Sequence, residues 1–406
     1  MVILLVAGCS NAGAAPDAVT YYGNVRPILA EHCVGCHVNG GIAPIALDTY
    51  ETATDAAALV AVRTAARIMP PFLADNSGQC QQFVTHDWLS DDEIATLAAW
   101  HQQGMPEGDP STPAPHVAEV PHLTGSDIHT VDTGVDYVPN AAQNDDYHCF
   151  LVQAPRGGYV TGAEVHPGNA RIVHHVIVFE PSDDSAVADV MALDAAEAGP
   201  GYTCFGDSGT SNATPVVLWA PGGGASIAPA GTGLQIDATR PLIVQVHYNL
   251  LSVRPGDTDR SSVDLQIKDS AIPGFFLPVY DGTFVAPPHM TSTSSHYDFS
   301  VGAAYLTPYG VTSAHVYSVG PHMHTLGRDI QLDMLNDDGT TDCMVHIPRW
   351  DFNWQRGYQY ESPIPITSTT RVRITCTWDT SSRDTTVRWG ESTQDEMCLA
   401  YLYVSL

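Results

Sequence analysis

The sequence is poor in basic residues and has no long apolar run. Lys and Arg together number 16 in 406 residues, against 45 Asp and Glu, and Lys268 is the only lysine. Because phosphate binding needs clustered basic side chains, this composition speaks against nucleic acid as a partner. The formal net charge of −29 is typical of a solvated acidic surface that keeps a protein dispersed. No stretch approaches the roughly 18 consecutive apolar residues of a membrane-spanning helix.

The N-terminus, MVILLVAGCSNAGAAPDAV, has a short apolar run that ends in Val6-Ala7-Gly8-Cys9. It resembles the lipobox of a bacterial lipoprotein signal, which implies export and membrane anchoring through a lipidated Cys9. The location would be the bacterial periplasm or the outer cell surface. The alternative is a merely apolar tail. In both cases we expect residues 1–19 to lie outside the fold.

Nine cysteines are present. If Cys9 carries lipid and two others carry a haem, six remain. An even remainder in an exported chain predicts disulfides in an oxidising compartment. Parity does not select the pairs among Cys80, Cys149, Cys204, Cys343, Cys376 and Cys398.

Residues 20–108 have a helical pattern, which predicts a small all-α domain. The runs DAAALVAVRTAARI and SDDEIATLAAWHQQG are alanine-rich and amphipathic. The second run begins with Ser90 and Glu93, the spacing of a capping box, and ends at Gly104. Residues 109–130 are rich in proline and polar residues, which predicts an extended linker.

After the linker, short β-branched runs alternate with Gly, Pro, Asn and Asp. Examples are RIVHHVIVFE, PLIVQVHYNL, AHVYSVGPHMHT, TRVRITCTW and CLAYLYVSL. This pattern is typical of antiparallel sandwiches or barrels. The length favours two β-sandwich domains of jelly-roll type, residues 131–270 and 271–406. The Pro-rich passage SAIPGFFLPVYDGTFVAPPH is the candidate boundary between them.

The run CVGCH has the pattern C-x-x-C-H. Cys33 and Cys36 are spaced to form thioether bonds to a haem, and His37 follows as an axial ligand of the iron. Met69 in RIMPPF is the candidate sixth ligand, since a thioether raises the reduction potential. The stretch resembles a small class I cytochrome c, which implies one covalently bound haem c. The alternatives are a redox dithiol or half of a zinc site.

Five of the 18 histidines lie in apolar runs that read as strands, namely His174, His175, His247, His322 and His324. A buried histidine is commonly a hydrogen-bonded core residue, but neutral imidazole also binds Cu, Zn, Fe and Ni. Strand alternation places His322 and His324 on one face and sends His174 and His175 to opposite faces. Joint ligation by His174 and His175 therefore requires a bulge or a strand end.

The order HH, VQVHYN, HMH and DEMC resembles the copper type II, ascorbate-dependent monooxygenases. The resemblance covers roughly residues 130–406 and implies two copper ions. One would be bound by His174, His175 and His247, and the other by His322, His324 and Met397. It further implies that O₂ binds at the methionine-containing site, where a substrate C–H bond is broken, and that the other copper delivers the second electron.

The same resemblance implies a disulfide between Cys376 and Cys398. We also predict a bridge between Cys149 and Cys204, and leave Cys80 and Cys343 unassigned.

Amidating members of the family hold a peptide carboxylate with an arginine, an asparagine and a tyrosine. The corresponding positions are Gly320, Leu399 and Tyr401. Only the tyrosine persists, so we do not expect peptide amidation. Tyr401 is either a pocket residue or part of the core. The acidic chain favours a neutral or cationic small molecule as substrate.

We therefore predict a copper-dependent monooxygenase that hydroxylates a C–H bond of a small organic substrate with O₂. Electrons from an external donor, either an ascorbate-like reductant or a redox protein, would reach copper through the attached haem. A second hypothesis is a non-catalytic electron-transfer or copper-binding protein. A third, a cytochrome with adhesive β-domains, predicts no stoichiometric copper.

Overall fold

The computed structural model of the protein describes residues 18–406 except 40–42, 44, 86, 118–120, 205–207, 211, 220–223, 230, 251–252, 337 and 391–394. Most of the predicted leader, including Cys9, lies outside these residues. The chain divides into two compact units. The first contains the described residues up to 70 and those of 86–118, and the second contains residues 71–85 and those of 119–406.

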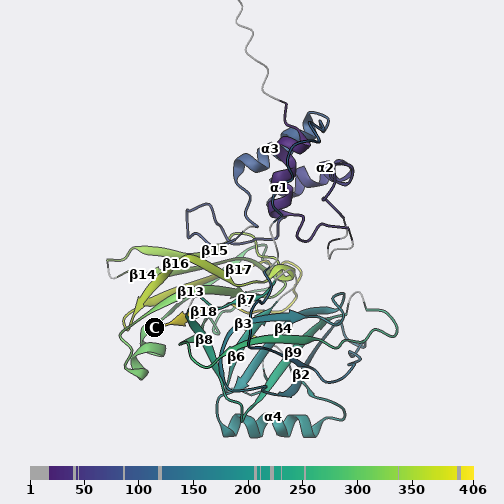
Figure 1. Cartoon of the computed structure of the whole chain (residues 1–406). Coiled ribbons are helices and arrows are strands. Elements are labelled where there is room, and N and C mark those ends of the chain that lie inside the picture. Colours follow the sequence, from purple (N-terminus) through teal and green to yellow (C-terminus); the bar gives the residue numbers. More distant parts are fainter. Residues whose placement is uncertain are drawn as a thin grey trace, which may run out of the picture. The chain divides into compact units, whose positions relative to one another are not determined.

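The helices of the N-terminal stretch lie in the first unit (Figure 1). A π-helical turn η1, Tyr21–Val25, leads into α1, Arg26–His32, and is followed by α2, Tyr50–Ala65, and α3, Asp91–Gln102. The apolar faces of these helices bury a common core that includes Tyr21, Leu29, Leu97 and Trp100.

The predicted ends of α3 are confirmed. The Ser90 hydroxyl accepts a hydrogen bond from the Glu93 amide, and the Glu93 carboxylate accepts one from the Ser90 amide. This capping box satisfies two backbone donors that the first turn leaves without helical partners. Gly104 follows the helix with φ of 80°, a left-handed conformation that glycine adopts without steric cost.

The second unit is built mostly from strands. One helix, α4, spans Asp184–Ala196, and short turns are η2, Gly302–Leu306, η3, Thr307–Tyr309, and η4, Phe352–Trp354. The strands are β1, Ile128–Asp132; β2, Asp145–Gln153; β3, Gly158–His166; β4, Val173–Pro181; β5, Tyr202–Thr203; β6, Ala213–Trp219; β7, Ser226–Ile227; β8, Thr232–Ile236; β9, Pro241–Asn249; β10, Ser262–Lys268; β11, Ile272–Tyr280; β12, Thr293–Phe299; β13, Ser313–His322; β14, Gly327–Leu335; β15, Thr341–Ile347; β16, Tyr358–Thr367; β17, Arg371–Trp378; and β18, Leu399–Ser405.

A nine-stranded sheet runs through the whole second unit. Its order is β1-β10-β3-β8-β11-β18-β13-β16, with β7 paired to β3. A five-stranded sheet, β5-β2-β9-β4-β6, comes from the first half of the unit, and a four-stranded sheet, β12-β17-β14-β15, from the second half. The passage predicted as a boundary forms β11, which pairs in parallel with β8 and antiparallel with β18. The two sandwich halves therefore share one continuous sheet.

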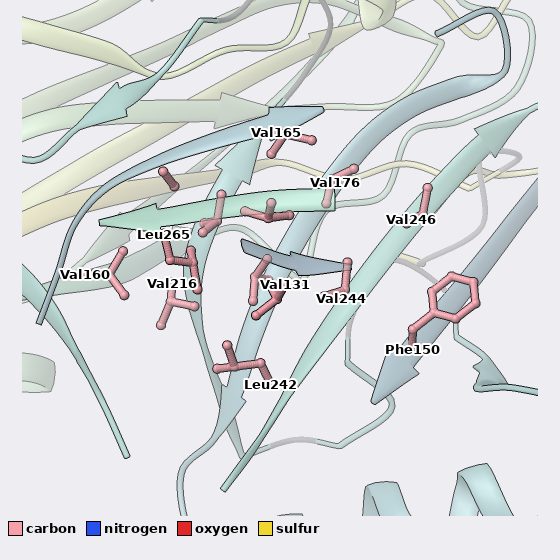
Figure 2. Packing of buried hydrophobic residues seen from close by; sticks show 14 of the residues in the cluster. Val131, Phe150, Val160, Val165, Val176, Val216, Leu242, Val244, Val246 and Leu265 are labelled. Carbon is pink, nitrogen blue, oxygen red and sulfur yellow. The ribbon is translucent and has the colours of Figure 1, made fainter. Parts of the chain in front are cut away.

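The core of the first half lies between the nine-stranded and five-stranded sheets. Figure 2 shows this cluster, in which Val165 and Leu265 come from the large sheet and Val176 and Val244 from the smaller one. Along β9, Leu242, Val244 and Val246 belong to this core, so the alternating residues Ile243, Gln245 and His247 point to the opposite face.

That opposite face of the five-stranded sheet is covered at one end by α4. Val190 of α4 packs there with Phe179, Ile243 and the bridge between Cys149 and Cys204. At the other end the alternation brings up polar residues, because His175 precedes Ile177 and Phe179 on β4 and His247 follows Ile243 and Gln245 on β9. The candidate site lies at this end.

Three disulfides occur among the described residues. The predicted pairs Cys376–Cys398 and Cys149–Cys204 are confirmed. The third joins Cys80 to Cys343, the two cysteines that the sequence left unassigned. Cys33 and Cys36 carry no disulfide.

Residues 71–85 fold with the second unit rather than with the helices that flank them in sequence. The Cys80–Cys343 bridge attaches this strap to β15. The Phe83 ring stacks on Tyr360 of β16 with 5.2 Å between ring centroids, and Phe72 meets Tyr358 edge to face at 5.0 Å. These contacts hold the strap in the second unit, although residues 71–85 lie between α2 and α3 in the sequence.

Among the described helices, none combines the length and the apolar character needed to cross a bilayer.

Candidate metal centres

Three neighbouring strands of the five-stranded sheet bring the first histidine cluster together. In the register, Tyr147 of β2 lies opposite His247 of β9, and His247 lies opposite His175 of β4. The Tyr147 ring stacks on the His247 ring with 4.0 Å between centroids and 5° between planes. His247 is fully buried, so this stack and its polar contacts fix the ring.

A bulge at His174 solves the problem that strand alternation poses. The register between β4 and β9 shifts between Val173 and His175, which leaves His174 without a strand partner. As a result His174 turns to the same side as His175. Nδ1 of His174 and Nδ1 of His175 are 3.4 Å apart, although the residues are adjacent in sequence.

One ring nitrogen from each of His174, His175 and His247 lies within 4.8 Å of the others. Nδ1 of His247 is 3.4 Å from Nδ1 of His175. Nε2 of His247 donates a hydrogen bond to the Asp145 carboxylate at 2.9 Å, so the proton sits on Nε2 and the lone pair is on Nδ1. We call these three histidines the first cluster.

The first cluster fits a metal ion of the first transition row. A tetrahedral ion with metal–nitrogen bonds of about 2.0 Å holds its ligand nitrogens about 3.3 Å apart. The observed Nδ1 separations are 3.4 Å. Three converging imidazoles are a donor set that suits copper and zinc.

The electrostatics of the first cluster favour neutral imidazoles. Burial lowers the pKa of His175 and of His247 well below the ordinary value, and it lowers that of His174 as well. Neighbouring histidines add to the effect, since each ring opposes a positive charge on the next. Neutral rings with free lone pairs are the form that binds metal ions.

We call His322, His324 and Met397, the ligands predicted for the other ion, the second cluster. Strand β13 ends at His322, so His324 lies in the turn that follows and not in the strand that the sequence predicted. The two rings still approach each other, with 5.1 Å between centroids and 85° between planes. Burial lowers the pKa of His322 to about 3, which keeps this ring neutral.

The hydrogen bonds of the second cluster place a proton on Nδ1 of both rings. Nδ1 of His324 donates to the Asp395 carbonyl at 3.2 Å, and a carbonyl oxygen can only accept. Nδ1 of His322 donates to the side-chain oxygen of Gln355. His247 thus carries its proton on Nε2, whereas His322 and His324 carry theirs on Nδ1.

Met397 is placed by contacts on both sides of it in the chain. The Asp395 carbonyl contacts the His324 ring, and Leu399 lies opposite His322 in the register of β18 with β13. The segment with Met397 therefore runs alongside the two histidines, and Met397 is buried with 5% of its surface exposed.

Glu396 links the segment that contains Met397 to the turn that follows β13. Its carboxylate accepts hydrogen bonds from the amides of His324 at 3.0 Å and Leu326 at 2.6 Å, and from Nε1 of Trp378 at 3.0 Å. Burial raises the pKa of Glu396 to about 7. A fully buried carboxyl group with three donors acts as a structural anchor at this end of the site.

The CVGCH motif begins at the end of α1. The amides of Cys36 and His37 donate to the Cys33 carbonyl at 3.1 and 2.9 Å. Nδ1 of His37 donates to the Ile45 carbonyl at 2.9 Å, which leaves Nε2 as the free nitrogen. Met69 lies beyond α2 in the same unit and is partly buried.

Sequence reasoning missed the residues that orient the histidines. Asp145, Tyr147, Phe352 and Gln355 contact the rings, but none belongs to a recognisable motif. The only sequence signal is indirect: Asp145 and Tyr147 begin the strand that pairs with VQVHYN, two residues apart on one face.

Comparison with known proteins adds a family match. Residues 277–404 match the family described as "Copper type II ascorbate-dependent monooxygenase, C-terminal domain". This segment contains all three residues of the second cluster, and the first cluster lies before it.

Three proteins illustrate the similarity over a longer stretch. DBH-like monooxygenase protein 1 of Gallus gallus is 25% identical over 295 residues, which are 65% of this chain and 45% of that protein. Tyramine beta-hydroxylase of Caenorhabditis briggsae is 23% identical and covers 66% and 46% of the two chains. Dopamine beta-hydroxylase of Homo sapiens is 23% identical and covers 68% and 46%. The chain thus spans about half the length of these relatives. The chain is thus similar to copper-dependent monooxygenases over this stretch.

Proposed function

We propose that this chain, similar to copper type II, ascorbate-dependent monooxygenases, is itself a copper-dependent monooxygenase. It would hydroxylate a C–H bond of a small organic substrate with O₂. Two copper ions would be bound, one by His174, His175 and His247 and one by His322, His324 and Met397. The observation that carries the proposal is the bulge at His174, which gathers three imidazoles with facing Nδ1 atoms, two of them buried and that of His175 partly buried.

Bound copper would supply one-electron chemistry between Cu(I) and Cu(II) and a centre for O₂ reduction. The two donor sets differ in softness. Three imidazoles serve both oxidation states, whereas the thioether of Met397 favours Cu(I). With two unlike sites, one copper can store an electron while the other reacts with O₂. A protein that only stores metal does not need two different sites.

The residues around the clusters hold the rings in their binding tautomers. The Asp145 carboxylate keeps the proton of His247 on Nε2. The Gln355 side chain and the Asp395 carbonyl keep the protons of His322 and His324 on Nδ1. Hydrogen-bond partners of this kind fix ring orientation and raise ligand basicity.

The register beside His322 supports a position for the substrate. Gly320 lies opposite Tyr401, and His322 lies opposite Leu399. These four residues therefore share one face of the nine-stranded sheet. A Cβ atom on Gly320 would meet only the backbone oxygen of Tyr401, at 4.0 Å, so there is room for a side chain at the position that holds a carboxylate-binding arginine in amidating relatives. We infer a neutral or cationic substrate beside Tyr401, and not a peptide carboxylate.

The helical unit would carry a covalent haem c on Cys33 and Cys36, with His37 and Met69 as axial ligands. Nε2 of His37, whose Nδ1 donates to the Ile45 carbonyl, and two cysteines outside any disulfide would supply the required groups. Burial raises the pKa of the Cys33 thiol to about 12, which disfavours the alternative of a reactive dithiol. The haem would pass electrons from an external donor towards the first cluster. Export, with or without lipid on Cys9, accords with three disulfides.

An oxygen-consumption assay tests the catalytic part of the proposal. Full-length protein loaded with copper and reduced anaerobically is mixed with O₂ and a panel of aryl-alkyl substrates. We expect oxygen uptake coupled to a hydroxylated product, and loss of both in His322→Ala. Copper binding without product from any substrate would support the non-catalytic electron-transfer hypothesis instead.

Stopped-flow reduction tests the haem relay separately. In the intact protein, the absorbance of reduced haem should decay as copper is reduced. A Cys33→Ser/Cys36→Ser variant should lose the covalent haem and this reaction, while an artificial reductant restores turnover. Haem that stays reduced beside oxidised copper would refute the relay but not the monooxygenase.

A further inference from the structure

One short turn contacts both histidine clusters. The 3₁₀ turn η4, Phe352–Trp354, connects β15 to β16, and Gln355 follows it directly. The Phe352 ring stacks on His174 of the first cluster with 5.2 Å between centroids and 15° between planes. The same ring meets His324 of the second cluster edge to face, at 6.1 Å and 88°. Both geometries are favourable arrangements of aromatic rings.

Gln355 extends the contact to a third histidine. Its side-chain nitrogen donates to the Phe352 carbonyl at 2.9 Å, which fixes the orientation of the amide. The amide oxygen must then face the other way, where it accepts the hydrogen bond from Nδ1 of His322. A displacement of Phe352 would therefore disturb His322 through the turn's own backbone.

The two clusters are linked through a single side chain, since His174 and His324 contact the same ring at centroid distances of 5.2 and 6.1 Å. The Phe352 ring contacts both groups.

We propose that the 352–355 turn is a positioning bridge, through which a copper ion at one cluster raises the affinity of the other cluster for copper. The inference rests on the proposed function and adds a role for residues that bind no metal themselves. A metal ion on the first cluster immobilises His174, and the immobilised ring orders Phe352 by stacking. The ordered turn then holds His324 at the Phe352 edge and His322 at the Gln355 amide. The second cluster therefore loses less conformational entropy when it binds its own ion.

The test is a thermodynamic cycle on copper affinity in the full-length chain. Chelator competition under anaerobic conditions measures the Cu(I) affinity of the first cluster in wild type, His324→Ala, Phe352→Leu and the double variant. His324→Ala empties the second cluster. Leucine keeps an apolar side chain at position 352 but removes the aromatic stack. Any direct repulsion between the two ions is the same in both backgrounds and cancels in the cycle.

We expect His324→Ala to lower the Cu(I) affinity of the first cluster. The factor should be larger by about 5-fold or more in the wild-type background than in the Phe352→Leu background. Such a difference is at the lower end of usual coupling. Phe352→Tyr, which retains a ring, should restore the difference. Phe299→Leu is the matched control, because Phe299 stacks on Tyr305 at 5.7 Å and 18° but has no ring contact with either cluster among the described residues. In the Phe299→Leu background, His324→Ala should lower the Cu(I) affinity of the first cluster by the same factor as in wild type.

Equal effects of His324→Ala in the two backgrounds would overturn the bridge while leaving two copper sites in place. A chain that binds no copper at either cluster would overturn the bridge and the proposed function together. Thermal unfolding of the metal-free variants shows whether each is folded. If Phe352→Leu does not fold, the cycle is run with Gln355→Ala, which leaves the ring intact and cuts the link to His322.

Discussion

The Asp145 carboxylate lies 2.9 Å from Nε2 of His247, a ring that is fully buried and stacked on Tyr147. A carboxylate–histidine pair of this kind fixes one tautomer and leaves Nδ1 free for a metal ion. The pair comes from two neighbouring strands, so the geometry of the sheet itself orients the candidate ligand.

Replacement of Asp145 by Asn should weaken copper binding at the first cluster. The amide can still accept from His247, but the negative charge is lost. Removing such a partner typically costs about 10–100-fold in metal affinity. The measurement is chelator competition in the His324→Ala background, where only the first cluster binds.

Asp264→Asn is the matched control for this change. Asp264 also pairs with a histidine, His166, at 3.0 Å, and both carboxylates have 25% of the side chain exposed. Its substitution should leave copper affinity unchanged. Equal losses in the two variants would contradict a specific role for Asp145.

Met397→Leu should selectively weaken Cu(I) binding at the second cluster. Leucine conserves the side-chain volume, so the cost to folding stability should stay below about 1.5 kcal/mol. The loss of a ligand should exceed the roughly 10–100-fold effect of an outer partner. Met344, also buried and in β15, provides the control variant Met344→Leu. The account is wrong here if the two variants bind Cu(I) equally well.

Removal of the Cys80–Cys343 bridge should destabilise the second unit. The bridge closes a loop with a sequence separation of 263 and holds the strap 71–85 on β15. A native disulfide typically contributes about 2–4 kcal/mol to the free energy of unfolding. Denaturant unfolding of Cys80→Ser/Cys343→Ser measures the loss, and limited proteolysis should show faster cleavage within 71–85. An unchanged unfolding midpoint would mean that the aromatic contacts of Phe72 and Phe83 suffice.

The pair of Asp298 and Arg373 predicts an acid-dependent contribution to stability. Nε of Arg373 donates to Asp298 at 2.6 Å across β12 and β17, and this hydrogen bond lowers the pKa of Asp298. A depressed carboxyl pKa contributes stability that is present above the unfolded-state pKa and is lost as the pH falls through the folded-state pKa.

Arg373→Gln should therefore cost about 0.5–1 kcal/mol at neutral pH, because both side chains are partly exposed. The difference from wild type should shrink below about pH 4, near the ordinary pKa of Asp. Asp298→Asn should show the same pH profile. Denaturant unfolding at several pH values makes the comparison, and a difference that is constant with pH would rule out the ion pair as its source.

Much of the fold follows from local pattern. The runs that predicted strands around His174, His247 and His322 all form strands, as do those that became β17 and β18. Hydrophobic alternation carries this information because one face of each strand is buried. The pattern did not reveal α4, which interrupts the strands between β4 and β5. The boundary passage became β11, a strand that tolerates Pro273 and Pro278 within the shared sheet.

The candidate ligands were also within reach of the sequence, since they occur in recognisable motifs. The need for a bulge at His174 followed from strand alternation alone, and the register shift supplies it. The partners that orient the rings were not predictable. Asp145, Phe352 and Gln355 reach the clusters only through tertiary placement of a strand and a turn. The Cys80–Cys343 pair was hidden for the same reason, because long-range pairing leaves no local signal.

Copper X-ray absorption, with metal quantification on the reduced full-length protein, tests the central claim most directly. The account predicts two copper ions per chain and a sulfur neighbour at one of them. Met397→Leu should remove the sulfur signal, whereas His247→Ala should lower the copper content to one and keep the sulfur. A chain without stoichiometric copper, or a sulfur signal that persists in Met397→Leu, would contradict the account.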